Sequence, residues 1–343
     1  MPRSIGIDGV LRRPEPDWIE ETMDRAILFT GQGAQKSGMG RDAAERDKEI
    51  MDLWKKAESI SRLPLRDIYW GNDGPETAVT MYVQPALTTL NLALWMRAAG
   101  TVRPAAAAGH SLGEFSAVAA AGVLSFERIL ELVSVRGKLM QEADGAGKGA
   151  MAAILKLDRG QAERCVAEAA QATGETILIA NYNTPEQFVA SGTRAAVSAL
   201  QGIVRGKKGR AVPLAVTGAF HSPLMRDAAA EFAGVLDAVS KTSWSTARFP
   251  VYCNAAPESL TDPERIKELM KRQMTSPVYW TDSIRRQWDA GCRVFIEFGP
   301  GPVLSRMVGP ILAGYVDDAC CEAGDTPWKS IAVSGPDELG NLP

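Results

Sequence analysis

The chain has 343 residues, of which 45% are hydrophobic and 23% charged, and its formal net charge at pH 7 is -3. This composition predicts a sizeable buried core, and the length favours a large domain carrying a second module. The small net charge gives no overall reason to expect binding to nucleic acid or to an anionic membrane. The five cysteines show no C-x-x-C spacing, which predicts reduced thiols in a cytoplasmic protein and no metal site.

The amino-terminal residues 1–24 carry several charges and no apolar stretch long enough for a signal peptide or a membrane span. We therefore expect an extension ahead of the first domain. An apolar run over residues 26–30 then ends at Gly31-Gln32-Gly33, which is typical of a buried strand that opens into a glycine-rich loop. Such a loop either makes a simple turn, the more common case, or points backbone N–H groups at an anion.

Two helices are expected next, over residues 41–61 and from Gln84 to about residue 99. Pro85 would lie in the first turn of the second helix, where its missing N–H is tolerated.

Ser111 stands in the pattern Gly109-His110-Ser111-Leu112-Gly113, between a run of alanines and an apolar helical pattern. Glycines on both sides allow a sharp strand-to-helix turn that holds the hydroxyl at the tip of the new helix, the position of a nucleophile. The same pattern also arises by chance in a chain with 32 glycines, so a plain turn before a helix is an equal alternative.

Arg136 lies on a helix expected over residues 126–141, with Ser125 as its N-cap. Its spacing from Leu132 and Val133 makes it lean toward the apolar face of that helix. From the pattern alone, a structural ion pair or a snorkelling side chain is the more common explanation for such an arginine.

Residues 147–216 show the β-α-β-β-α-β order of a ferredoxin-like module. The strand and helix alternation of a larger sheet resumes after this segment, so we expect an insertion into a large α/β core made of residues 25–146 and 217–316. Residues 317–343 lack periodicity and are expected to form a peripheral tail. The expected strands are 151–157, 176–180, 187–191, 210–216, 249–253 and 293–298, and the helices 159–172, 193–204, 263–274 and 282–290.

His221 is the candidate base for Ser111. The chain has only two histidines, and the other, His110, immediately precedes Ser111, so its side chain should point away from that hydroxyl. If Ser111 needs an imidazole, His221 supplies it. The alternative is a buried histidine near a domain junction.

These motifs, taken in order, resemble those of the malonyl-CoA:acyl carrier protein transacylases and of the acyltransferase domains of polyketide synthases. The resemblance covers roughly residues 25–307 and implies a hydrolase-like α/β core, with a mainly parallel sheet, interrupted by a ferredoxin-like α+β subdomain. The motifs that carry it are Gly31-Gln32-Gly33-Ala34-Gln35, Gly109-His110-Ser111-Leu112-Gly113-Glu114, Arg136, Phe220-His221 and Gln273.

The resemblance implies a two-step transfer. His221 would remove the proton of Ser111, which attacks the malonyl thioester, and the pantetheine thiol of holo acyl carrier protein would then take the malonyl group. The oxyanion would lie between the backbone N–H groups of Gln32 and Leu112. A backbone carbonyl near Gln273 would orient the imidazole in place of an acidic residue.

Arg136 would hold the malonyl carboxylate, with Gln84 and Asn181 at polar positions near the pocket. Phe220 resembles the malonyl-preferring members of the family, because its ring would crowd a branched acyl group. No cofactor is expected to be bound permanently, and malonyl-CoA would be the substrate.

A basic segment, Arg205-Gly206-Lys207-Lys208-Gly209-Arg210, stands out in a chain of negative net charge. It precedes the last strand of the insertion, so it should lie near the mouth of the cleft. The implied role of Arg205, Lys207, Lys208 and Arg210 is docking of the acidic carrier protein or of coenzyme A phosphates. The alternative is an ordinary solvated loop.

Fatty acid biosynthesis is the expected pathway. The alternatives are a discrete polyketide-synthase acyltransferase, a serine esterase or thioesterase, and a non-catalytic docking protein that kept the fold. Intact Ser111, His221, Arg136 and Gln32 favour the transferase.

Overall fold

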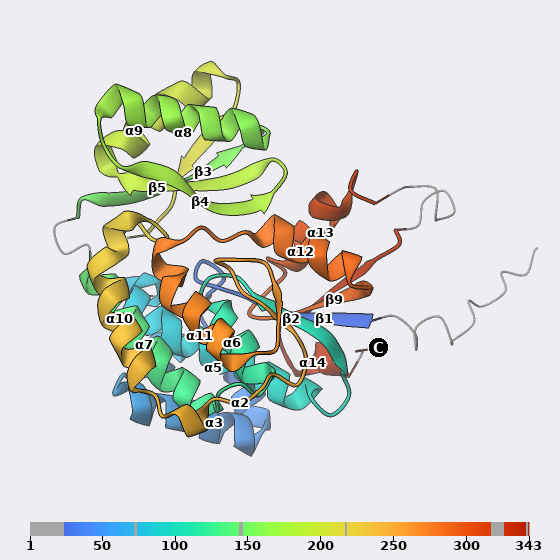
Figure 1. The fold of residues 1–343 in the computed structure, drawn as a ribbon. Helices are drawn as coiled ribbons and strands as arrows, with labels where there is room; N and C mark the ends of the chain where they lie inside the picture. Colours follow the sequence, from blue (N-terminus) through green and yellow to red (C-terminus); the bar gives the residue numbers. More distant parts are fainter. Residues whose placement is uncertain are drawn as a thin grey trace, which may run out of the picture.

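The computed structural model describes residues 24–71, 74–143, 147–216, 218–316, 326–340 and 342 of the chain. The extension expected over residues 1–24 lies outside the described residues, except for Asp24. Two separate sheets organise the molecule, a six-stranded sheet and, above it in Figure 1, a four-stranded sheet. The predicted fold class is confirmed, since the larger sheet is mainly parallel and the smaller one antiparallel.

The six-stranded sheet is parallel except at its β8 edge. Side chains of β1 alternate between two layers: Ile27 and Phe29 face the larger helical layer, and Ala26 and Leu28 face α12 and α13. The strand order is β10 (Lys329–Val333), β9 (Cys292–Phe298), β1 (Asp24–Phe29), β2 (Pro104–Gly109), β7 (Val251–Tyr252) and β8 (Ser259–Leu260).

Helices of the larger layer bury their apolar stripes in one continuous core. They are α2 (Arg41–Arg46), α3 (Lys48–Ser61), α4 (Leu65–Trp70), α5 (Thr80–Ala98), α6 (Gly113–Ala120), α7 (Phe126–Glu142), α10 (Arg226–Ala238) and α11 (Pro263–Arg272). The opposite face carries α12 (Trp280–Asp289) and α13 (Ser305–Leu312), and α14 (Pro336–Leu339) follows β10. Short 3-10 turns are η1 (Pro75–Ala78), η2 (Pro223–Met225), η3 (Lys241–Ser243) and η4 (Gln273–Thr275).

The four-stranded sheet has the order β4 (Ile177–Thr184), β5 (Gln187–Thr193), β3 (Gly149–Leu155) and β6 (Arg210–Pro213). This is the strand order of a ferredoxin-like module. Its helices, α8 (Arg159–Thr173) and α9 (Arg194–Gly206), bury a separate core on one face. Side chains of the other face, such as Met151 and Val189, join the core of the larger domain, so this face looks down on the larger domain (Figure 1).

Three predicted elements are wrong in detail. The helix expected over residues 41–61 is two helices, because Asp47 adopts extended backbone angles and caps α3 through the N–H groups of Glu49 and Ile50. The helix expected to begin at Gln84 begins at Thr80, so Pro85 lies inside it. The tail expected over residues 317–343 contributes strand β10, which pairs with β9 and is too short for its apolar pattern to predict it.

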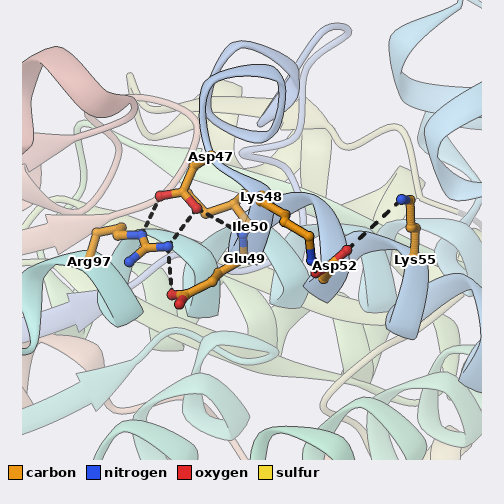
Figure 2. Close-up of polar contacts among 7 residues, drawn as sticks. All are labelled: Asp47, Lys48, Glu49, Ile50, Asp52, Lys55 and Arg97. Atoms are coloured by element: carbon orange, nitrogen blue, oxygen red, sulfur yellow. Dashed lines mark hydrogen bonds and ion pairs between the residues drawn. The ribbon is translucent and has the colours of Figure 1, made fainter.

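The start of α3 is tied to the end of α5. Arg97 contacts both carboxylate oxygens of Asp47 at 2.5 Å and one of Glu49 at 2.7 Å (Figure 2). A separate chain of exposed pairs joins Lys48, Asp52 and Lys55 along α3. The cap of one helix is therefore also an ion-pair partner of another.

The two domains are joined by backbone hydrogen bonds beside the cleft. The N–H of Val278 donates to Ala180, and the N–H of Tyr182 donates to Val278. The rings of Tyr182 and Tyr279 stack with centroids 5.4 Å apart. The smaller sheet is thus extended by a segment of the larger domain. Among the described residues, no helix is long and apolar enough to cross a membrane.

Candidate active site

The turn at Ser111 has the sharp geometry of a nucleophile elbow. Ser111 adopts a left-handed φ of 51° between the end of β2 and the start of α6. A Cβ atom at Gly109 would lie 1.9 Å from the carbonyl carbon of Gly113, and one at Gly113 would lie 2.0 Å from the oxygen of Phe29. Both flanking glycines are therefore needed for close backbone approach, as the pattern predicted.

His221 faces the serine hydroxyl. Its Nε2 lies 2.7 Å from Ser111 Oγ, while its Nδ1 lies 3.0 Å from the carbonyl oxygen of Gln273 and 3.2 Å from that of Ser276. Because Nδ1 faces two acceptors, it carries the ring proton, and the lone pair of Nε2 is directed at the hydroxyl. Among the described residues no carboxylate contacts this ring, and two backbone carbonyls orient it instead.

The His221 ring is neutral in this setting. Burial lowers its pKa to about 3, with a smaller lowering from the nearby Arg136 charge, against hydrogen bonds to Gln273 and Ser276 that raise it. His221 also has a left-handed φ of 56°. A neutral imidazole in contact with a hydroxyl can act as a general base.

Arg136 is 1% exposed and lies beside the nucleophile. Its two terminal nitrogens donate to the side-chain oxygens of Gln84 at 2.9 Å and Gln273 at 2.8 Å, and one of them is 3.4 Å from Ser111 Oγ. Its guanidinium carbon lies 5.3 Å from the ring centre of Phe115. Burial lowers its pKa to about 10.

No carboxylate of the described residues lies within ion-pair distance of Arg136. A structural ion pair, one explanation that the sequence left open, is therefore absent from this part of the chain. The fully buried Glu114 does not contact Arg136, but its charge opposes the lowering of the Arg136 pKa by burial. A buried cation without an ion-pair partner in contact is costly to maintain.

The loop after β1 packs directly against the elbow. A Cβ atom at Gly31 would lie 2.1 Å from the carbonyl oxygen of His110. The Gln32 side chain donates to Thr80 at 3.0 Å, and the backbone N–H groups of Gln32 and Leu112 donate to no acceptor among the described residues. Two backbone donors beside a serine are the arrangement that an oxyanion hole requires.

A cavity of about 260 Å³ opens between the two domains at these residues. Its walls include the predicted residues Gln32, Ser111, Arg136, Asn181, Phe220 and His221, together with apolar side chains such as Met140, Met151, Val189 and Val303. Gln84, Leu112 and Gln273 lie behind this surface, where Gln84 and Gln273 hold Arg136.

The basic segment lies at the edge of the smaller sheet. Gln187, Leu155 and Arg210 are directly paired across three strands, and paired residues share a face. Since Gln187 lines the cavity, Arg210 lies on the cavity side of that sheet. Arg205 is in the last turn of α9, and Lys207 and Lys208 form the turn that follows.

Asn254 was missed by sequence reasoning, and His110 and Glu114 were quoted in the motif without a role in the site. Asn254 binds the elbow through its carboxamide, and Glu114 accepts from the Asn254 N–H. His110 does point away from the hydroxyl, but it lines the cavity and contacts Asn183 at 2.8 Å. Asn254 stands in no recognisable motif, whereas Glu114 could have been noticed as a charge in an otherwise small and apolar helix.

The parallel sheet, the elbow serine and its histidine define an α/β protein of the serine acyl-transfer class. Residues 27–315 match the model of the family described as "Acyl transferase domain". The chain belongs to this family, and the resemblance expected from its motifs is confirmed.

Similar proteins carry more specific names. The chain is 37% identical over 317 residues to the malonyl CoA-acyl carrier protein transacylase of Bacillus subtilis, covering 92% of this chain and 94% of that one. An acyl carrier protein S-malonyltransferase from Vibrio cholerae superposes with a TM-score of 0.83 at 33% identity, covering 93% of this chain and 99% of that one. A malonyl-transacylase solved in complex with a type II PKS acyl-carrier protein gives a TM-score of 0.84 at 31% identity, covering 93% and 98%.

Proposed function

We propose that this protein transfers a malonyl group from malonyl-CoA to the pantetheine thiol of acyl carrier protein through a malonyl-serine intermediate. The observation that carries the proposal is the buried Arg136, which makes no ion-pair contact among the described residues and lies 3.4 Å from the Ser111 hydroxyl. A substrate with a carboxylate near its reactive carbonyl supplies that contact. The names of the similar transacylases agree with this substrate.

In the first half-reaction, His221 Nε2 takes the Ser111 proton while Oγ attacks the thioester carbonyl. The negative charge that develops on the carbonyl oxygen is stabilised by the N–H groups of Gln32 and Leu112. The intermediate then expels the coenzyme A thiolate, which receives the proton from the imidazolium.

In the second half-reaction, the pantetheine thiol of the carrier protein gives its proton to His221 and attacks the malonyl ester. Ser111 Oγ leaves and regains a proton from the imidazolium. The same base, oxyanion donors and arginine serve both steps, so no additional acid is required.

Arg136 would bind the malonyl carboxylate with two parallel hydrogen bonds, since a planar guanidinium matches a carboxylate. Its charge also lowers the pKa of His221. A bound carboxylate offsets that charge and makes the imidazole a stronger base. Binding of the correct acyl group therefore favours the proton transfer that follows.

Phe220 limits the width of the pocket, and Asn181 supplies a polar wall. Both line the cavity and are each 5% exposed. Arg205, Lys207, Lys208 and Arg210 would receive the carrier protein or coenzyme A phosphates at the edge of the cleft. We also propose that residues 147–216 form an inserted domain within a core of residues 25–146 and 217–316.

Malonyl-CoA serves as substrate, and the proposed mechanism needs no permanently bound cofactor. No group of three or more His, Cys, Asp or Glu side chains within the described ranges could hold a metal ion. We propose fatty acid biosynthesis in the cytoplasm as the setting, in keeping with the free thiols of Cys165, Cys253 and Cys292. A discrete polyketide-synthase acyltransferase would use the same site.

Intact-protein mass spectrometry tests the proposal. The protein should gain the mass of one malonyl group with malonyl-CoA and lose it when holo acyl carrier protein is added. Ser111→Ala should remain folded and gain nothing. A protein that releases free malonate as fast without the carrier as with it would be a thioesterase, and a Ser111→Ala variant that still gains the group would exclude this nucleophile.

A further inference from the structure

The left-handed conformation of Ser111 is unfavourable for any residue with a Cβ atom. Such a backbone conformation costs on the order of 1–3 kcal/mol and persists only where surrounding contacts enforce it. Ser111 keeps it, with a φ of 51°, even though the flanking glycines alone would permit many other turns. Something outside the turn must select this one.

The Asn254 side chain spans the turn. Its Oδ1 accepts a hydrogen bond from the Ser111 N–H at 2.6 Å, and its Nδ2 donates to the carbonyl oxygen of Gly109 at 2.6 Å. A carboxamide has one acceptor and one donor edge, and here each edge meets its complement. The two peptide groups on either side of His110 are therefore held at a fixed separation.

Asn254 is itself held in place from three directions. It follows β7, which pairs with β2 in parallel. Asn254 and the turn at Ser111 therefore lie at the carboxyl ends of neighbouring strands. Its N–H donates to Oε2 of the fully buried Glu114, and its carbonyl accepts from the Tyr279 N–H at 3.2 Å. The side chain is 2% exposed, so water does not compete for these bonds.

We infer that Asn254 is a positioning residue for Ser111, whose carboxamide holds the elbow in the conformation that directs Oγ at His221. Asn254 is not among the residues that line the cavity, and the hydrogen bonds of its side chain are to backbone atoms and not to Oγ. It also occupies the Ser111 N–H, which leaves the Leu112 N–H as the donor for the oxyanion. The inference rests on the proposed acyl transfer at Ser111.

The test compares acylation rates of wild type, Asn254→Ala and Asn254→Asp, normalised to the folded protein. In Asn254→Ala we expect the maximal rate of Ser111 acylation by malonyl-CoA to fall on the order of 100-fold, as for a misplaced reacting group. The half-saturating malonyl-CoA concentration should stay unchanged. The inference would be overturned if Asn254→Ala kept the wild-type maximal rate, or if only its half-saturating malonyl-CoA concentration changed.

Asn254→Asp keeps the side-chain volume, and its acylation rate can be followed against pH. A purely structural role of Asn254 would not make this rate depend on pH relative to wild type. A protonated carboxyl can still accept from Ser111 and donate to Gly109, whereas an ionised one cannot donate. The ratio of the variant's rate to that of wild type should therefore rise as the pH falls. Glu114, the titratable side chain that contacts Asn254, is present in both proteins. A constant ratio would contradict the inference.

Asn91→Ala is the matched control, because it removes another buried carboxamide, bonded to Thr30 and Ser116 and not to the elbow. It should lower stability while the rate per folded molecule stays near wild type. An equal fall in rate for both alanine variants would contradict a specific role of Asn254. The same variants are then compared in Ser111 acylation by p-nitrophenyl acetate, which does not require malonyl-CoA. If wild type reacts with this ester but not with malonyl-CoA, the proposed function fails while the role of Asn254 can still be tested.

Discussion

Arg136 is a costly residue for the fold and a useful one for the site. Its guanidinium is buried and held by two carboxamides, Gln84 and Gln273, which orient it without neutralising it. A core built only for stability would place an apolar side chain here. The charge next to Ser111 fits the proposed binding of a substrate carboxylate.

Arg136→Ala should weaken malonyl transfer by about 3 kcal/mol, or on the order of 100-fold in kcat/KM, because a charged hydrogen-bonded pair is lost. Acetyl-CoA should become relatively better as a donor. Arg136→Lys keeps the charge without the planar fork. Its kcat/KM for malonyl transfer should lie between those of wild type and Arg136→Ala. An unchanged malonyl-to-acetyl preference in the alanine variant would rule out carboxylate recognition by this residue.

Glu114 is the other buried charge near the elbow. Burial raises its pKa from 4.5 to about 7, although Asn254, Gln273 and Arg136 oppose this shift. In the unfolded chain the pKa of this carboxyl is near 4.5. Between pH 4.5 and about 7, the native state therefore binds one proton more than the unfolded state. Stability from this group is therefore present below about pH 4.5 and is lost as the pH rises through 7.

Glu114→Gln removes this titration. The variant should gain on the order of 3 kcal/mol in unfolding free energy relative to wild type between about pH 4.5 and pH 8. Urea unfolding of both proteins across this range measures the difference. The lowered pKa of His221 has the opposite effect on stability but is common to both proteins. A difference that does not change with pH would show that Glu114 is not the titrating group.

At the scale of elements, the connection between α11 and α12 organises the site. The backbone of Gln273 and Ser276 orients His221, and the Gln273 side chain holds Arg136. Val278 pairs with β4 of the smaller domain, and the Tyr279 N–H donates to Asn254. One short segment therefore contacts His221, Arg136, Asn254 and strand β4 of the smaller sheet.

The contact of Arg97 with Asp47 and Glu49 provides a test of helix docking in the larger domain (Figure 2). Arg97→Ala should lower the unfolding free energy by about 1 kcal/mol, since the pair is bidentate but partly exposed. The difference should shrink at high salt. Lys48→Ala, which removes an exposed pair with Asp52, is the control and should have no measurable effect. Equal losses for both variants would show that Arg97 adds nothing beyond surface charge.

At the scale of the whole molecule, the site is assembled where the face of the smaller sheet meets the core of the larger one. The elements around the larger sheet supply Ser111, His221 and Arg136, and the smaller sheet contributes the wall with Asn181 and Val189. In the proposed reaction the pantetheine arm enters between them, and we expect the carrier protein to dock at the mouth of the cavity. Arg210 lies on the cavity side of the smaller sheet, although it does not line the cavity itself.

Reversal of Lys207, Lys208 and Arg210 to glutamate should lower the second-order rate with carrier protein by on the order of 10-fold at low salt. The salt dependence should weaken, and the rate with a small neutral thiol should hardly change. The matched control reverses Lys48, Lys55 and Lys56 on α3, at the far end of the molecule from α9 (Figure 1). Equal losses with both acceptors, or for both sets of charges, would leave the basic segment as an ordinary surface loop.

Local chemistry determined much of the fold from the sequence alone. Glycines around Ser111 permitted a sharp turn, Ser125 marked a helix start, and the order of elements over residues 147–216 indicated the module. Each of these signals acts over a few residues, and for that reason it is readable without coordinates. The helix starting at Thr80 was misplaced because burial in α5 outweighed the usual position of Pro85.

Tertiary structure alone decided what surrounds the serine. Asn254 and Ser276 carry no local signal, since their role depends on a strand pairing and a helix connection more than a hundred residues from Ser111. Strand β10 was unreadable for the same reason, because only the edge of β9 makes its short apolar pattern a strand. The turn at Ser111 is thus determined by its neighbours in sequence, and the orientation and electrostatic environment of its hydroxyl by contacts that only folding brings together.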